Sequence, residues 1–311
     1  MNDLVSVIIT TYKRSNKIED AILSVLNQTY KNIEIIVVDD NANNLEERNK
    51  TEKIVKKYKN INYIQNKKNM GGAISRNIGI KASKGEYVSF LDDDDIYFPE
   101  RINKMMSIFK KFKKTDNVGL VYCNCDRIND NKEIIGSYTN NYNGNPIYQQ
   151  MMGCIAGTSM WLTKKNILEK IGMFEDTPCK QDSIVLLKLL VNGYNVYCVN
   201  ESLVYYYEHN GNGISGTKQS NIDGLINYRN WCRKYYKLLN NIDKKRNIEC
   251  NFSSKLVSLY VLNNQMKNAK KELKILLKNK PVSFITFKAL VKYVFPKMYI
   301  KKIRGWFKWK K

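Results

Sequence analysis

The stretch NMGGAISRNIGIKASKGEYVSFLDDDD, residues 69–95, contains the elements that decide the fold. Its glycine pair, Gly71-Gly72, precedes a segment that we expect to be helical through Lys81. Residues 86–91 (EYVSFL) form a β-rich run that predicts a buried strand, and the four aspartates of residues 92–95 follow it directly. A helix followed by a buried strand that ends in acids is consistent with an α/β sheet.

The same alternation extends through about the first 125 residues. Strand-like runs lie at residues 5–10 (VSVIIT), 33–38 (IEIIVV), 61–64 and 118–123, and helical spacing lies at residues 17–28, 45–58 and from Pro99 to about 113. This order predicts a Rossmann-like, mostly parallel sheet with helices on both faces. In such sheets the ligand crevice lies outside the carboxyl ends of the strands, where both acid clusters of this region occur.

The second half of the chain is less regular. Residues 161–168 and 184–191 are helical or strand–helix in pattern, and residues 195–199 and 202–207 are expected to be strands. From about residue 220 the pattern is helical. We therefore expect a domain over residues 1–216 and a basic helical C-terminal extension over residues 217–311.

Positive charge is concentrated near the C-terminus. The chain has 52 Lys and Arg against 29 Asp and Glu, a net charge of +23. Residues 264–311 contain 15 Lys and Arg and one acid, Glu272, which gives +14 and leaves about +9 for the rest. Residues 297–311 also combine an apolar stripe with basic residues and with Trp306 and Trp309. This tail predicts binding to an anionic membrane surface, and the alternative is a helix packed on the body with a solvated basic face.

Other features of the composition restrict location and chemistry. The seven cysteines are odd in number and form no CxxC pair, which favours reduced thiols in a cytosolic protein. No signal peptide is visible, and the longest apolar stretch, residues 282–295, is too short and too charged to span a bilayer. A serine or cysteine nucleophile needs a histidine partner, and the chain has only one histidine, His209.

The acid clusters have a chemical interpretation. Four adjacent carboxylates repel one another, and Mg²⁺ or Mn²⁺ takes one or two carboxylates together with substrate phosphate oxygens. The alternative is a solvated acidic turn or a helix cap. Asp39-Asp40 follows the strand at residues 33–38, where a carboxylate can accept a hydrogen bond from a base or a ribose hydroxyl or can cap the next turn.

The order of VSVIITTYKR, LNQTY, IEIIVVDD and the stretch at residues 69–95 resembles the family 2 glycosyltransferases of the GT-A fold, over about residues 4–215. The resemblance implies that four residues hold the nucleoside: Thr10, Tyr12, Asp39 and Asp40. It implies that Asp92-Asp93-Asp94 is the family's Asp-x-Asp motif at the donor. In that motif Asp94 leads as metal ligand and Asp92 supports it. Arg76 then contacts the diphosphate.

The resemblance also implies a catalytic base. Lys180-Gln181-Asp182 precedes an apolar helical pattern and is similar to the family's Glu-Asp, with Gln in place of Glu. Asp182 is the expected base, and helix capping is the alternative or additional role. His209 follows the last core strand, where a histidine joins the metal in several relatives; a structural role is the alternative. Gly211, Gly213 and Gly216 spell GxGxxG too late in the chain for a dinucleotide site.

Taken together, the resemblance implies an inverting, metal-dependent glycosyltransferase of the hexosyltransferase type. Its expected donor is a UDP-sugar, and its acceptor a glycan or lipid-linked oligosaccharide in cell-surface polysaccharide biosynthesis. We expect it to be cytoplasmic and peripheral on the inner face of the cell membrane. The alternatives are a polyprenyl-phosphate glycosyltransferase, a non-catalytic glycan-binding protein, and a nucleic-acid-binding protein. The last rests on charge alone and leaves the acid clusters unexplained.

Overall fold

The protein is described from a computed structural model, in which residues 3–208 and 219–301 are described. The chain divides into two compact units. The first contains residues 1–147, 154–176 and 181–208, and the second contains residues 148–153, 177–180 and 209–311. The expected boundary at residue 216 lies in the segment 209–218, outside the described residues, and stays a prediction.

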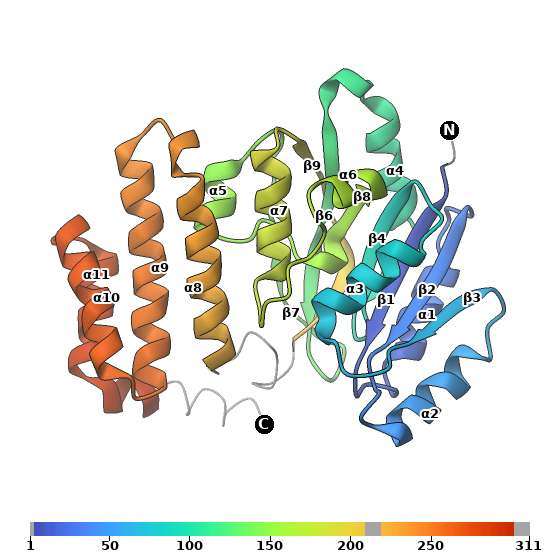
Figure 1. Cartoon of the computed structure of the whole chain (residues 1–311), viewed down its shortest axis with the longest axis horizontal. Coiled ribbons are helices and arrows are strands. Elements are labelled where there is room, and N and C mark those ends of the chain that lie inside the picture. The colour runs from blue at the N-terminus through green and yellow to red at the C-terminus, as the bar shows by residue number, and fades with distance from the viewer. Residues whose placement is uncertain (1–2, 209–218, 302–311) are drawn as a thin grey trace. The chain divides into compact units, whose positions relative to one another are not determined.

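The first unit is a sheet covered by helices (Figure 1). Its strands are β1 (Val5–Thr11), β2 (Ile33–Asp39), β3 (Ile61–Gln65), β4 (Tyr87–Asp92), β5 (Ile96–Tyr97), β6 (Val118–Ile128), β7 (Ile134–Tyr138), β8 (Trp161–Lys164) and β9 (Asn195–Tyr207). Its helices are α1 (Ile18–Leu26), α2 (Leu45–Val55), α3 (Gly71–Ala82), α4 (Arg101–Lys111), α6 (Lys165–Lys170) and α7 (Gln181–Val191), with 3₁₀ turns at Lys114–Asp116 and Thr158–Met160.

The sheet has the order β3-β2-β1-β4-β8-β6-β9-β5, and β7 pairs with β6. β1, β2, β3 and β4 are parallel, β8 is antiparallel to both β4 and β6, and β9 is parallel to β6. β6 and β9 therefore run in the same direction as β1 to β4, and only β5, β7 and β8 run against them. The predicted fold class, a mostly parallel sheet with helices and a C-terminal helical part, is confirmed.

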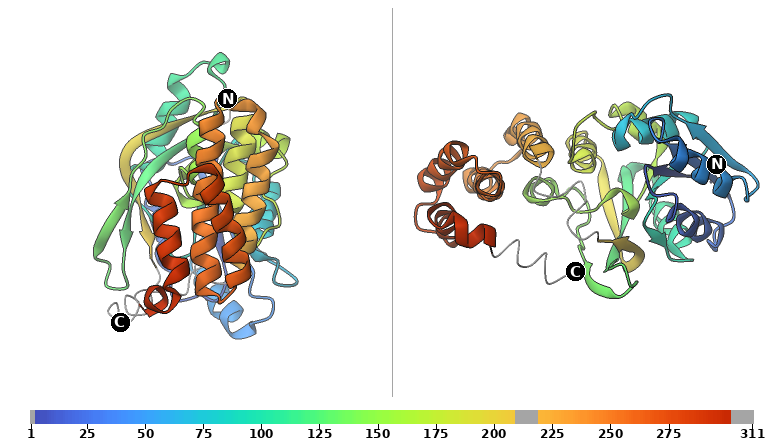
Figure 2. Two further views of the ribbon diagram at one scale, coloured as in Figure 1. Left: turned by 90° about the vertical axis from the view of Figure 1, so that its left-hand side faces the viewer. Right: turned by 90° about the horizontal axis from the view of Figure 1, so that it is seen from below.

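Side chains alternate between the two faces of the sheet. Phe90 on β4 meets Trp161 and Phe174 at ring-centroid distances of 6.3 and 5.2 Å, on the face that α3 covers. Tyr87, an odd number of residues earlier on the same strand, instead meets Phe109 of α4 at 5.1 Å. Figure 2 shows α3 and α4 on opposite sides of the sheet. This two-sided burial explains why the strands are continuously apolar in sequence.

Some boundaries differ from the sequence expectation. The two strands expected at residues 195–199 and 202–207 form one strand, β9, because its pairing with β6 continues through register shifts. α2 ends at Val55 rather than near residue 58. The short strands β5 and β7 were not expected, since neither contains a long apolar pattern.

The second unit consists of antiparallel helices in its described part (Figure 1). They are α8 (Gln219–Lys234), α9 (Ile242–Leu262), α10 (Met266–Asn279) and α11 (Phe284–Val294), with a 3₁₀ turn at Tyr236–Leu238 and most of α5 (Ile147–Met152). Asn241 caps α9 by accepting from the backbone N–H groups of Asp243 and Lys244, and Ser283 caps α11 by accepting from that of Thr286. In the described ranges, every helix falls short of the length and apolarity that a membrane crossing requires.

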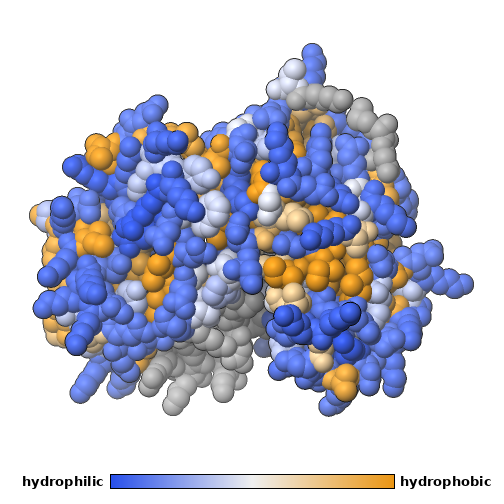
Figure 3. Space-filling model, in the orientation of Figure 1, coloured by the Kyte–Doolittle hydropathy of each residue, from blue (hydrophilic) through white to orange (hydrophobic). Residues whose placement is uncertain are grey.

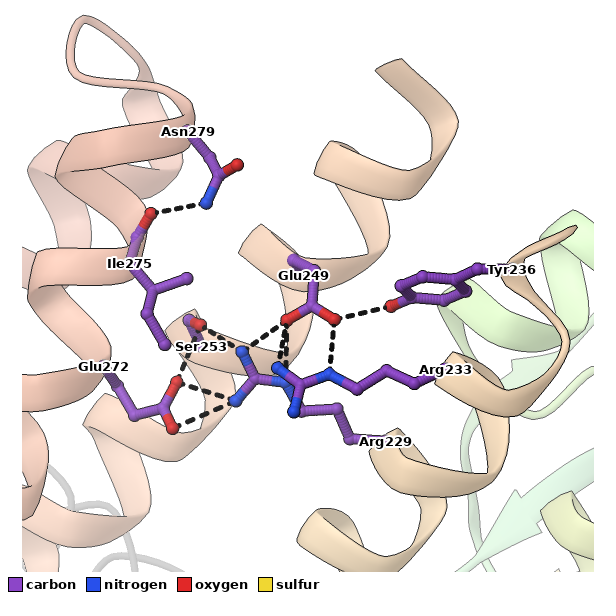
Figure 4. A network of polar contacts seen from close by, with 8 residues as sticks. All are labelled: Arg229, Arg233, Tyr236, Glu249, Ser253, Glu272, Ile275 and Asn279. Carbon is purple, nitrogen blue, oxygen red and sulfur yellow. Dashed lines mark hydrogen bonds and ion pairs between the residues drawn. The ribbon is translucent and has the colours of Figure 1, made fainter. Parts of the chain in front are cut away.

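A buried ionic network ties α8, α9 and α10 together (Figure 4). The Arg229 guanidinium donates to Glu249 and Glu272, with an Nη1–Oε2 distance of 2.9 Å to Glu272. Arg233 also pairs with Glu249 at 2.7 Å, and Ser253 joins the network by donating to Glu272 at 2.7 Å. Burial opposes ionisation of Glu249, but the bonds from Arg233 and Arg229 prevail and lower its pKa to about 2.

We expect Arg229→Met to destabilise the helical unit by about 3–5 kcal/mol, because both glutamates would lose a buried partner. Arg233→Met, at a half-exposed arginine, is the matched control and should cost less than about 1 kcal/mol. Hydrogen exchange of the α9 amides, followed by mass spectrometry, measures both changes. Equal exchange in the two variants would contradict the importance of the buried pair.

The same network predicts a pH dependence. Because the folded pKa of Glu249 is about 2 and an unfolded glutamate titrates near about 4.3, the stabilisation is complete above about pH 5. It should be lost as the pH falls toward 2, by at most about 3 kcal/mol. In Arg229→Met this acid-dependent loss should shrink, which the same exchange experiment at pH 6 and pH 3 would show.

Candidate active site

The carboxyl ends of three neighbouring strands bring the two acid clusters together. In the sheet register, Thr11 at the end of β1 is opposite Asp39 at the end of β2, and Thr10 is opposite Asp92 at the end of β4. Tyr12 follows β1 with 37% of its surface exposed. The sequence expectation that these residues share one edge of the sheet therefore agrees with the geometry.

Asp39 and Asp40 have different environments although both are buried. The Asp39 carboxylate accepts from the Tyr63 hydroxyl and from the Asn41 backbone N–H, at 2.7 Å for the latter. Burial and this bond to Asp39 raise the pKa of Tyr63 above its usual value. Arg48 Nε lies 3.9 Å from Asp39 Oδ1, so the buried carboxylate is surrounded by polar groups of the protein at the end of β2.

Asp40 holds the start of α3. Its oxygens accept from the backbone N–H groups of Met70 and Gly71, both at 2.8 Å, and from Asn66 Nδ2 at 2.7 Å. A carboxylate on these N–H groups is favoured by the helix dipole. Asp40 thereby fixes the helix on which Arg76 lies.

The four aspartates of residues 92–95 are divided between two arginines and the protein interior. Arg76 Nη2 donates to Asp92 Oδ1 at 2.6 Å. Arg14 Nη1 lies 2.7 Å from Asp94 Oδ2 and 3.0 Å from Asp93 Oδ1. Arg76 and Arg14 therefore supply positive charge to Asp92, Asp93 and Asp94.

Asp93 and Asp95 face inward. Asp93 Oδ2 accepts from the backbone N–H of Tyr12 at 3.2 Å, and Asp95 Oδ1 accepts from that of Tyr207 at 3.0 Å. Burial raises the pKa of Asp93 to about 7, with the charge of Asp94 adding to the rise and Arg14 opposing it. Burial and the charges of Asp94 and Asp92 raise the pKa of Asp95 well above its usual range. Asp92 is thus the partly exposed member of the run, and Asp93, Asp94 and Asp95 are buried.

Arg76 connects the acid run to the start of α7. Its second amino group, Nη1, donates to Gln181 Oε1 at 3.0 Å. A Cβ atom at position 72 would lie 3.2 Å from this Nη1, so a side chain there would require a small shift of Arg76. Asp182, the expected base, directly follows Gln181 in the chain. The arginine that binds Asp92 therefore also binds the residue next to the expected base.

Asp182 is half-buried in the first turn of α7. Its Oδ1 accepts from the backbone N–H of Ser183 at 2.7 Å, and its Oδ2 accepts from the Cys154 thiol at 3.6 Å. The carboxylate is therefore oriented by these two donors. Such a carboxylate can take the proton of an acceptor hydroxyl.

The remaining expected site residue, His209, lies outside the described residues, as do Gly211, Gly213 and Gly216 of the rejected dinucleotide motif. Within the described residues, no group of three or more His, Cys, Asp and Glu is arranged to hold a metal ion. The divalent-cation site expected at Asp94 and Asp92 stays a prediction, and in the structure these carboxylates pair with Arg14 and Arg76.

Sequence reasoning missed three contacts of this site. Arg14 pairs with Asp93 and Asp94, Gln181 binds Arg76, and Cys154 touches Asp182. The only sequence feature that could have indicated the role of Arg14 was its position, three residues after the end of the first strand. Nothing local marks Cys154, which reaches the site from 28 residues earlier in the chain.

Comparisons with known proteins agree on one family. A family model described as glycosyl transferase family 2 matches residues 6–172. An uncharacterized glycosyltransferase of Haemophilus influenzae is 28% identical over 311 residues, 96% of this chain and 98% of the relative. The uncharacterized glycosyltransferase MJ1057 of Methanocaldococcus jannaschii is 31% identical over 211 residues, 65% of this chain and 70% of the relative.

Among solved structures, residues 1–349 of S. aureus TarS in complex with UDP-GlcNAc are similar, with a TM-score of 0.58 at 15% identity. The match covers 97% of this chain and 92% of that one. The same TarS fragment in complex with UDP gives a TM-score of 0.57 at 14% identity, with 97% and 91% covered. At these identities the likeness supports the fold.

Proposed function

The chain belongs to glycosyl transferase family 2, and from this premise we propose that it transfers a sugar from a UDP-sugar to a hydroxyl group, with inversion. The observation that carries the proposal is the Arg76 bridge. This arginine joins Asp92, at the expected donor phosphates, to Gln181, next to the expected base. TarS, a neighbour in fold, was solved with UDP-GlcNAc and with UDP.

The nucleoside would lie at the ends of β1 and β2. The exposed Tyr12 ring offers a stacking surface, and Asp39, buried at the end of β2, would accept an N–H of the base. Thr10 lies at the same strand end. Asp40 contributes indirectly by fixing the start of α3, and Asp93 by holding the Tyr12 backbone.

The diphosphate would lie beside Arg76 and the acids Asp92 and Asp94. Asp94, supported by Asp92, would hold a Mg²⁺ or Mn²⁺ ion, and His209 is a further proposed ligand. When bound, such an ion supplies positive charge that stabilises the leaving diphosphate. Arg14 and Arg76 hold the two acids in place, and Arg76 can offer its forked N–H groups to phosphate oxygens.

In the transfer step, Asp182 takes the proton of the acceptor hydroxyl. The acceptor oxygen forms a bond to the anomeric carbon on the face opposite the leaving group, while the bond from that carbon to the β-phosphate oxygen breaks. The electron pair leaves with UDP. One displacement of this kind inverts the anomeric configuration.

For the acceptor we propose a glycan or lipid-linked oligosaccharide of cell-surface polysaccharide biosynthesis, with the enzyme peripheral on the cytoplasmic face of the membrane. The support is the basic tail of residues 297–311, of which residues 302–311 lie outside the described part. A lipid-linked acceptor would be confined to a bilayer, so an enzyme that uses it benefits from contact with that surface.

A thermal-shift panel tests the donor. The protein would be heated with UDP-, GDP-, dTDP- and CMP-sugars, each with and without Mn²⁺. A UDP-sugar at about a hundred times its Kd should add about 2.7 kcal/mol, a rise in Tm of about 5 °C or more, and Mn²⁺ should enlarge the rise. Stabilisation by a GDP-sugar alone, or by no nucleotide at all, would contradict the proposed donor.

A further inference from the structure

One face of α11 is apolar and exposed. The side chains on it include Phe284 and Phe287, which are 71% and 61% exposed, and Val294, which is 53% exposed. The opposite face carries Thr286 and Ala289, which are buried. Figure 3 shows apolar side chains at the edge of the molecule where α10 and α11 lie in Figure 1.

The exposed residues form one stripe along the helix. Phe284, Phe287, Leu290 and Val294 follow helical spacing on α11, and Val282, Phe295 and Met298, beyond its two ends, are also exposed. Residues 296–301 are helical again after the break at Phe295, so the stripe continues beyond α11. A run of exposed aromatic and aliphatic side chains on one helix marks an interaction surface.

The segment of sequence that contains the stripe is positively charged. Residues 264–301 carry ten lysines and one acid, Glu272, and that acid is engaged by Arg229 in the network of Figure 4. Lys288 lies on the stripe itself, with its Nζ 4.1 Å from the centroid of the Phe284 ring. Apolar side chains flanked by lysines without competing acids complement a surface that is both apolar and anionic.

We propose that this stripe, residues 282–298, is the surface by which the protein binds an anionic lipid bilayer, with α11 lying parallel to the membrane plane. The phenylalanines would enter the boundary between headgroups and acyl chains, and Lys288 and Lys297 would meet lipid phosphates. The proposal concerns a different surface from the transfer site, and it places the principal contact on α11 rather than on the tail.

Charge argues against a second copy of this chain on the stripe, and apolar surface argues against nucleic acid. A second copy seated on the stripe would bring lysines against lysines. Residues 302–311 contain five Lys and Arg and no acid, so they would add like charge as well. A nucleic acid would satisfy the lysines but would leave the aliphatic part of the stripe, Val282, Leu290, Val294 and Met298, in water.

The test is vesicle co-sedimentation of the full-length chain. Vesicles of phosphatidylglycerol and phosphatidylcholine would be compared with vesicles of phosphatidylcholine alone. Phe284→Ser combined with Phe287→Ser should reduce binding to the anionic vesicles by about tenfold or more, because two inserted rings are lost. Leu45→Ser combined with Ile242→Ser, at residues that are 68% and 60% exposed elsewhere, should leave binding within about twofold.

A third variant, Trp306→Ser combined with Trp309→Ser, separates the stripe from the tail and should weaken binding less than the stripe variant does. Equal sedimentation of the stripe variant and the native chain would overturn the proposal, as would a loss confined to the tail variant. Conversion of a native dimer into a monomer by the stripe variant, without an effect on vesicles, would assign the face to self-association. Binding of a DNA oligonucleotide in place of vesicles would assign it to nucleic acid.

Two further measurements keep these outcomes clear. A Phe287→Trp variant should show blue-shifted extra fluorescence on anionic vesicles, and its absence would contradict insertion even if the serine variant folds poorly. The nucleotide thermal shift of the stripe variant should equal that of the native chain. A failure of membrane binding is then distinguishable from a failure of the proposed donor.

Discussion

Replacing Asp94 by Asn should abolish sugar transfer, by about a thousandfold or more, while leaving the fold intact. The substitution removes the negative charge that would hold a divalent cation at the donor phosphates, a contribution of several kcal/mol to the transition state. The fold should survive because the shape is nearly unchanged and Arg14 keeps its other partner, Asp93, at 3.0 Å. The donor would be the nucleotide sugar that stabilises the protein most in the thermal-shift panel. UDP release from it, measured at increasing Mn²⁺ concentrations, gives the rate and the metal dependence.

Asp20→Asn is the matched control for this variant. Asp20 lies half-exposed on α1 and pairs only weakly with Lys132, so its removal subtracts the same charge away from the strand ends. A folded Asp94→Asn protein with near-normal turnover and unchanged metal dependence would remove Asp94 from the proposed mechanism.

Replacing Asp182 by Asn should leave donor binding nearly unchanged and lower turnover by about a hundredfold or more, the scale of lost general-base catalysis. Asn cannot take the acceptor proton, but its carbonyl oxygen can still accept from the Ser183 backbone N–H that now binds Asp182 at 2.7 Å. The local start of α7 should therefore be retained. Donor affinity would be measured by titration calorimetry and turnover by UDP release.

Gln181→Glu provides the neighbouring control. It keeps an oxygen acceptor for Arg76 and restores the acid that the family often has at this position, so turnover should stay within a few-fold of native. If Asp182→Asn instead loses donor affinity and turnover equally, Asp182 is a structural cap and the base lies elsewhere.

The sequence predicted the strands that frame this site because each parallel strand is marked by its own apolar run. The apolar runs that became β1, β2 and β4 each ended in the residues that the register brings together, Thr11, Asp39 and Asp92. Since parallel strands align their carboxyl ends, no long-range contact had to be known. The helical character of the second unit followed in the same way from local periodicity.

The divided roles of the acids could not be predicted from their spacing. Asp39 and Asp40 are adjacent acids, yet one binds the Tyr63 hydroxyl and the other binds the start of α3. Which way each carboxylate points depends on Tyr63, Asn66 and Gly71, which fold back from the next strand and helix. The Arg76–Gln181 contact joins residues 105 positions apart and has no local signature.

The assignment of two short segments to the second unit could not be predicted from local sequence patterns. Residues 148–153 and 177–180 belong with the C-terminal helices although they lie within the expected first domain. Their membership depends on contacts such as the bond from Gln150 Nε2 to the Tyr228 hydroxyl, at 3.1 Å. Such side-chain pairings across 78 residues leave no periodic pattern in the sequence.

The central claim is that this protein transfers a sugar from a UDP-sugar by a single displacement, and proton NMR of the first-formed sugar tests it most directly. In the absence of a known acceptor, water can take that place slowly, and the anomeric signal of freshly released sugar reports the stereochemistry before mutarotation. The account predicts that an α-linked UDP-sugar first gives the β anomer, at a rate that falls in Asp182→Asn. Release of the α anomer first, or no release above a heat-denatured control, would contradict it.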